Sequence, residues 1–116
     1  DTTPLDVTDG IFFLKSDGGT TVTFIVEKDS TQSTLDLPNA LADDTFMTIG
    51  FVYDPKDQKF HVFQNNVLAG TVVSTNAPDN EEMTLSFGIQ NGAAAAKTLT
   101  VDYVGAMKER TAVTEL

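Results

Sequence analysis

The sequence contains no cysteine and no tryptophan, and His61 is its only histidine. The lack of cysteine excludes disulfides, thiolate metal ligands and a cysteine nucleophile. The lack of tryptophan removes the broadest aromatic platform on which a sugar ring could stack. No apolar run is long enough to span a bilayer, so the sequence predicts no membrane partner.

Basic residues are also scarce, with 7 Lys+Arg against 17 Asp+Glu and a formal net charge of −10. Contacts with phosphate groups need clustered Lys and Arg, and the seven basic residues are scattered along the chain. We therefore expect no nucleic-acid partner. The acidity favours partners that are neutral or basic.

The chain of 116 residues, 41% of them hydrophobic, has the size and composition of one folded domain covering 1–116. Within it, 1–8 is interpreted as an arm or edge segment and 105–116 as a polar tail, in which Met107–Ala112 could form one helical turn. Because the chain opens at Asp1 rather than at Met, processing or a shortened sequence is expected.

The stretch Phe46–Val73 is the clearest structural signal in the chain. Alternating side chains over 46–53, 59–64 and 67–73 have the period of two that is typical of strands. Asp54–Gln58 has turn chemistry around Pro55, and Asn65-Asn66 supplies a second turn because Asn tolerates a positive φ. The stretch is predicted to be a three-stranded meander.

Similar patterns occur on both sides of this meander. They predict strands over 11–15, 20–28, 33–37, 83–89 and 99–104, separated by Gly, Pro, Asn and Asp turns. With about eight short strands and no long helix, the predicted fold class is all-β, an antiparallel β-sandwich or a barrel.

Some of these stretches resemble a known fold family, the concanavalin A-like (laminin G-like) jelly rolls. The similarity lies in Asp9–Phe13, Val22–Lys28, Asp43–Phe46 and the pair Gly50-Phe51, and in Phe60–Val67, which is similar to a hairpin of that family. Asn66 stands where the family usually has Gly. The resemblance implies a jelly-roll sandwich.

A narrower resemblance lies in Ala42–Phe46, Pro78–Thr84, Gln90–Tyr103 and the pair Glu109-Arg110. These stretches are similar to the structural proteins of tailed-phage virions, often described as head decoration proteins. Such proteins look longer at the N-terminus, so the resemblance implies that one or more N-terminal strands are missing from the sequence. The resemblance implies a non-enzymatic protein on the capsid surface, assembled in the host cytoplasm. The implied partners are the major capsid protein and copies of the chain itself, with a trimer suiting a three-fold position. The first eight residues and the tail are the expected inter-subunit contacts.

The acids and His61 lack the patterns of known catalytic sites. Jelly-roll glycosidases place acids at alternating positions of one strand, but here only Glu27 and Asp29 are two residues apart, and Asp29 begins a loop. His61 has no nucleophile motif beside it and is interpreted as a packing residue. We therefore expect no enzyme and no catalytic residue.

The acidic clusters and the glycine pair also lack the patterns of metal and cofactor sites. The acids Asp43/Asp44 and Asp79/Glu81/Glu82 lack the spacing of a calcium loop and are interpreted as solvated. Asp17-Gly18-Gly19 opens a strand rather than a helix, so it is a turn and not a phosphate cradle. We expect no metal site and no cofactor.

The alternative function is carbohydrate binding, as in a lectin-like module. The polar residues that could line a sugar site are His61, Gln64, Asn65 and Asn66. Both Tyr and most of the eight Phe lie at alternating positions that predict a core-facing orientation, which leaves few stacking platforms.

Overall fold

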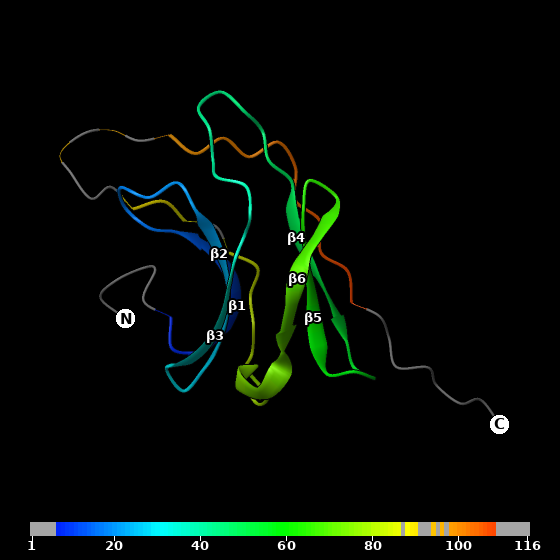
Figure 1. Cartoon of the computed structure of the whole chain (residues 1–116). Helices are drawn as coiled ribbons and strands as arrows, with labels where there is room; N and C mark the ends of the chain where they lie inside the picture. The colour runs from blue at the N-terminus through cyan, green and yellow to red at the C-terminus, as the bar shows by residue number, and fades with distance from the viewer. Residues whose placement is uncertain (1–6, 87, 91–93, 95, 97, 109–116) are drawn as a thin grey trace.

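The computed structural model describes residues 7–86, 88–90, 94, 96 and 98–108. Two antiparallel three-stranded sheets lie face to face (Figure 1). The first has the order β1-β2-β3 and the second β4-β5-β6. The bounds of the strands are Gly10–Lys15, Val22–Lys28, Thr31–Asp36, Ile49–Asp54, Lys59–Gln64 and Val67–Val73. The expected all-β class is therefore confirmed.

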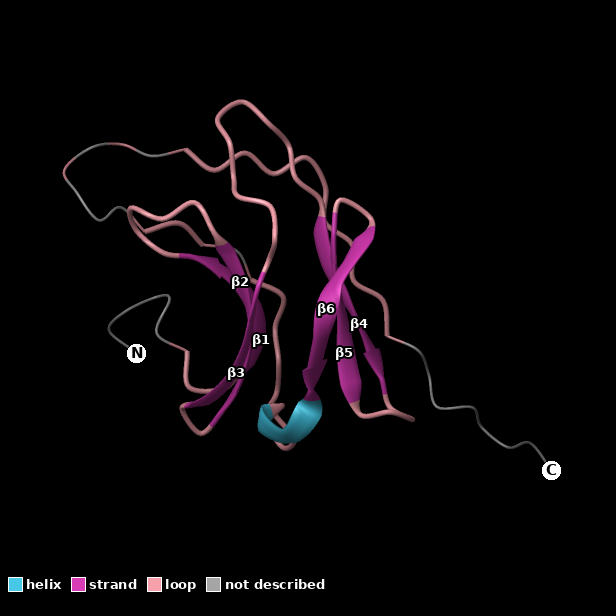
Figure 2. Ribbon diagram, in the orientation of Figure 1, coloured by secondary structure: helices cyan, strands magenta, loops and turns pink. Residues whose placement is uncertain are grey.

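The predicted strand count is wrong for the described residues, which hold six strands rather than about eight. Residues 83–86, 88–90 and 98–108 are drawn as loop in Figure 2, and no strand lies over 83–89 or 99–104 among the residues described there. Alternating side chains predict which face each residue would occupy, but a strand also needs a neighbour for its backbone groups. The described residues of these two stretches have no such neighbour within the described part of the chain.

Helical structure among the described residues is limited to one 3₁₀ turn, η1 (Ser74–Asn76), directly after β6. Met107 and Lys108 are not helical, and the rest of the predicted helical turn lies outside the described residues. Most of the predicted 1–8 arm also lies outside them. Thr8 is described, and its carbonyl accepts the Ser30 N–H at 2.9 Å, which ties the start of β1 to the β2–β3 turn.

The turns follow the local chemistry of the sequence. Asn65 and Asn66 have φ of 51° and 64°, as the hairpin requires. Asp54 Oδ1 accepts the Lys56 N–H at 2.9 Å, which shapes the β4–β5 turn. Strand boundaries differ from the prediction by a few residues, most of all in β4, which begins at Ile49 rather than Phe46.

The core lies between the sheets. Val22, Phe24 and Val26 share one face of β2, as predicted, and pack against Phe60 and Val62 of β5. The remaining buried members are Leu37 and Val72. Fully burying each such side chain contributes about 1.5–3 kcal/mol.

The two sheets approach most closely where β3 meets β6. A Cβ added at Gly70 would lie 3.0 Å from Leu35 Cδ2, so a larger residue here would require the Leu35 side chain to shift. On this side the sandwich is closed.

Candidate functional site

The opposite side of the sandwich, where β1 and β4 lie, is open. Both strands are at the end of their sheet, so neither has a neighbour on its outer edge among the described residues. A hollow of about 3710 Å³ is lined by β1, by residues 41–53 and by a later part of the chain. We call this region the open side.

The floor of the open side is aromatic. Phe13, Phe24, Phe51 and Phe60 form one group, with ring centroids 5.1 Å apart for Phe13 and Phe24, 5.3 Å for Phe24 and Phe51, and 5.8 Å for Phe51 and Phe60. Phe24 and Phe60 are buried, but Phe51 is 40% exposed because no strand covers the outer edge of β4. The core therefore continues into an unclosed surface.

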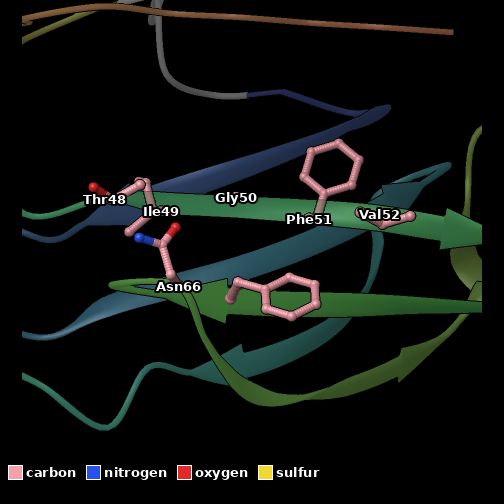
Figure 3. A pocket seen from close by; sticks show the side chains of 7 residues that line it. Thr48, Ile49, Gly50, Phe51, Val52 and Asn66 are labelled. Atoms are coloured by element: carbon pink, nitrogen blue, oxygen red, sulfur yellow. The ribbon is translucent and has the colours of Figure 1, made fainter.

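A smaller pocket of about 410 Å³ follows the free edge of β4 (Figure 3). Five consecutive residues, Thr48–Val52, line it together with Phe63 and Asn66. Ile49 and Phe51 belong to the inner face of the sheet, whereas Gly50 and Val52 belong to the outer face. The pocket thus wraps around a strand edge that has no strand neighbour among the described residues, which is the geometry that accepts an added strand.

The later part of the chain that lines the hollow is exposed. We call the described residues from 79 to 108 the distal segment; its part from 82 onward lines the hollow. In Figure 1 its last part (orange) crosses above the sheets and descends beyond β4. Its large apolar side chains are between 45% and 98% exposed, and they are Met83, Leu85, Ile89, Leu99, Val101, Tyr103, Val104 and Met107.

The predicted core-facing orientation of the aromatics is therefore wrong for several of them. Phe46 and Tyr103 are 70% and 72% exposed, and Phe51 and Tyr53 are partly exposed. Phe51 and Tyr53 do occupy inner-face positions, opposite Val62 and Phe60, so their face agrees with the alternation. Both side chains are partly exposed because no strand lies beside the outer edge of β4 among the described residues.

One ion pair holds the start of the distal segment. Lys28 Nζ, at the end of β2, donates to Asp79 Oδ2 at 2.5 Å. This hydrogen bond raises the pKa of Lys28 and lowers the pKa of Asp79. Glu81 Oε2 accepts the N–H groups of Asp79 and Asn80, so these acids have structural contacts.

The candidate acids do not come together as ligands. Among the described residues, no group of three His, Asp or Glu side chains is placed to hold a metal ion. Asp43 and Asp44 lie in the loop before β4, and Asp79 pairs with Lys28. Gly18 has φ of 70° and lies in the turn after β1, as its sequence predicts.

Glu27 and Asp29 have different structural roles and do not form a pair of catalytic acids. Glu27 is buried and accepts a hydrogen bond from Gln32 Nε2 at 3.0 Å. Asp29 is a turn residue with φ of 49°, and its N–H donates to Asp9 Oδ1. His61 is half-buried on the outer face of β5, with Nε2 3.9 Å from Asp54 Oδ2, while the other oxygen of Asp54 serves the turn.

Two of the four residues predicted for a sugar surface have structural roles instead. Gln64 is 1% exposed; its Oε1 accepts the Asn39 N–H at 2.9 Å and its Nε2 donates to the Asn39 carbonyl at 2.7 Å. Asn65 Oδ1 accepts the Thr48 N–H at 3.1 Å. The signal for Gln64 was present in the sequence, because it shares the period of two with Phe60 and Val62.

Within the part of the chain that the structure describes, no helix is both long enough and apolar enough to cross a membrane. The chain matches no protein-family model, no curated protein and no solved structure. The open side and the distal segment are accordingly the features from which a function can be argued.

Proposed function

We propose that the chain is a non-enzymatic structural protein of a phage virion, which decorates or cements the outer surface of the capsid through protein–protein contacts. Its partners would be the major capsid protein and copies of itself. The observation that carries the proposal is the open side, where two unpaired strand edges flank a partly exposed aromatic floor. Surfaces of this kind bind protein segments by strand addition.

The sequence resemblance supports the same proposal and its finer fold. The two facing antiparallel sheets would form part of a concanavalin A-like jelly roll, the fold that Asp9–Phe13 and Phe60–Val67 resemble. A shell offers many equivalent sites, so even modest contacts would sum to a high avidity. Three copies grouped around a three-fold position would suit such a shell.

The direct test is the composition of purified particles. Phage particles from cells that express the chain would be purified through two density gradients and quantified by mass spectrometry. We expect the chain at a fixed molar ratio to the major capsid protein, unchanged by the second gradient. A ratio that falls towards zero on repurification would contradict the proposal.

Carbohydrate binding is the second candidate, and the pocket at the β4 edge favours it. Phe63, on the outer face opposite Gly50, could provide a stacking surface there, and Asn66 could provide an amide. A glycan array should then give a saturable hit that Asn66→Ala weakens. Gln64→Ala is not a suitable test, because Gln64 bonds the Asn39 backbone instead.

A further inference from the structure

The open side has two strand edges without a neighbour among the described residues, and the distal segment has exposed apolar side chains. We propose that the open side binds the distal segment of a second copy of the chain, which adds its backbone to the edges of β1 and β4. This inference deepens the proposed function, on which it rests, by naming one partner of the open side. The proposed partner of the open side is therefore a second copy of this chain.

The acceptor consists of two edges of equal length. β1 and β4 each contain six residues, and each ends its sheet on the side that lines the hollow. Phe13 of β1 and Phe51 of β4 face one another between them, with ring centroids 6.3 Å apart. An added strand would find backbone hydrogen-bonding groups on either edge and apolar side chains on the inner side.

The donor has the pattern that such an acceptor requires. Residues 83–89 and 99–103 alternate between apolar residues and polar or glycine residues over seven and five positions, lengths close to the six residues of β1 and of β4. Leu99 and Val101 are separated by Thr100, so one face of an extended strand would be apolar and the other polar. The described residues of the donor have no strand neighbour of their own.

In a single copy, the edges of β1 and β4 have no further strand beside them among the described residues, and the apolar side chains of the distal segment are exposed. Its distal segment lines the hollow, yet Leu85, Leu99 and Tyr103 are each more than half exposed. The segment starts at the end of β2, where Asp79 is held by Lys28, and from there it runs along the rim. Exposed apolar surface of this extent usually marks a protein contact.

Exchange between copies would satisfy both surfaces at once. Each copy contributes one donor and one acceptor, so two copies can exchange segments about a two-fold axis, or three can close a ring. The net charge of −10 per chain opposes association of identical copies. Added salt should therefore tighten the assembly, because it screens the repulsion and leaves apolar contacts intact.

The test uses the absence of native cysteine, which allows disulfides to form only where cysteines are introduced. V52C places a thiol on the outer face of β4. It would be mixed with T98C, T100C or D102C, three alternating positions that cover different registers, with the second chain carrying a size tag. Under mild oxidation we expect a disulfide-linked heterodimer with one of the three. A mixture of V52C with T34C, an exposed position on β3, is the control that should not cross-link.

The mass in solution gives an independent readout. Light scattering should report two or three times the chain mass of 12.5 kDa, rising in population with added salt. Leu99→Asp should return the protein to one chain mass with the cooperative unfolding retained, because Leu99 is exposed within a single copy.

Two results would overturn the inference. One is a single-chain mass at every concentration and salt level. The other is a V52C/T100C double variant whose disulfide forms only within one chain, which would mean that the distal segment closes its own sandwich. Both measurements use purified protein without particles, so they fail or succeed separately from the particle-composition test of the proposed function.

Discussion

Gln64 is a buried amide that joins two parts of the fold. Its carbonyl oxygen and its amino group both bond the backbone of Asn39, which lies in the connection between β3 and β4. Gln64→Leu would keep the volume but leave a backbone N–H and a carbonyl unpaired. We expect a loss of about 1–3 kcal/mol in the free energy of unfolding, measured by urea denaturation.

The control for this prediction is His61→Leu, on the outer face of the same strand. This variant should change the stability by no more than about 0.5 kcal/mol, as surface substitutions usually do. Equal losses for the two variants would show that the Asn39 contact is not what matters at Gln64.

Gly70 allows the two sheets to meet. An added Cβ would lie 3.0 and 3.1 Å from the two methyl groups of Leu35, so Gly70→Val must displace the Leu35 side chain from its position between β3 and β6. We expect a loss of about 1–3 kcal/mol in thermal or urea unfolding. Gly50→Val is the matched control because nothing lies within 4 Å of a Cβ at Gly50, and a similar loss there would contradict the argument.

At the scale of elements, the β5–β6 hairpin depends on two positive φ angles in its turn. Asn66 has φ of 64°, and glycine adopts this conformation without steric cost. We expect Asn66→Gly to raise the free energy of unfolding by a few tenths to about 1 kcal/mol. Asn65→Gly should raise the free energy of unfolding by less, or lower it, because this substitution removes the hydrogen bond that Asn65 Oδ1 accepts from the Thr48 N–H.

The edge of β4 is the element on which association depends. Val52 is 59% exposed at this edge, and a lysine on an edge strand opposes the addition of another strand. We expect Val52→Lys to abolish the oligomer in light scattering while it leaves the unfolding of the single chain unchanged. Val73→Lys, 51% exposed on β6, is the matched control and should leave the oligomer intact.

At the scale of the whole molecule, one exposed ion pair connects the sandwich to the distal segment. The hydrogen bond from Lys28 lowers the pKa of Asp79, so the stabilisation is present above the ordinary carboxyl pKa and is lost as pH falls through the lowered value. The same hydrogen bond raises the pKa of Lys28 above its ordinary value of 10.5. The stabilisation is therefore present below that ordinary value and is lost as pH rises through the raised pKa.

The expected result is a pH-dependent effect of Asp79→Asn. At neutral pH the variant should be slightly less stable than the native chain, and the difference should vanish in acid once Asp79 is protonated in the native chain. Added salt should also reduce the difference, because both side chains are exposed. A difference that stayed constant from neutral pH into acid would exclude the ion pair as its cause.

The sequence by itself determined the all-β class, the positions of six strands and the chemistry of their turns. These features depend on local geometry: a period of two places Phe60 and Val62 on one face, and Asn65-Asn66 accepts a positive φ wherever it occurs. The same local pattern over 83–89 and 99–104 predicted strands that the described residues do not form.

The tertiary structure alone decided which strand edges find a partner. A strand is completed by hydrogen bonds to another part of the chain, and no local pattern states which part that is. The packing of distant segments likewise brings Lys28 to Asp79, 51 residues away. It also brings Gln64 within hydrogen-bonding distance of the Asn39 backbone. The open side exists for the same reason, because β1 and β4 end their sheets together on one side of the core.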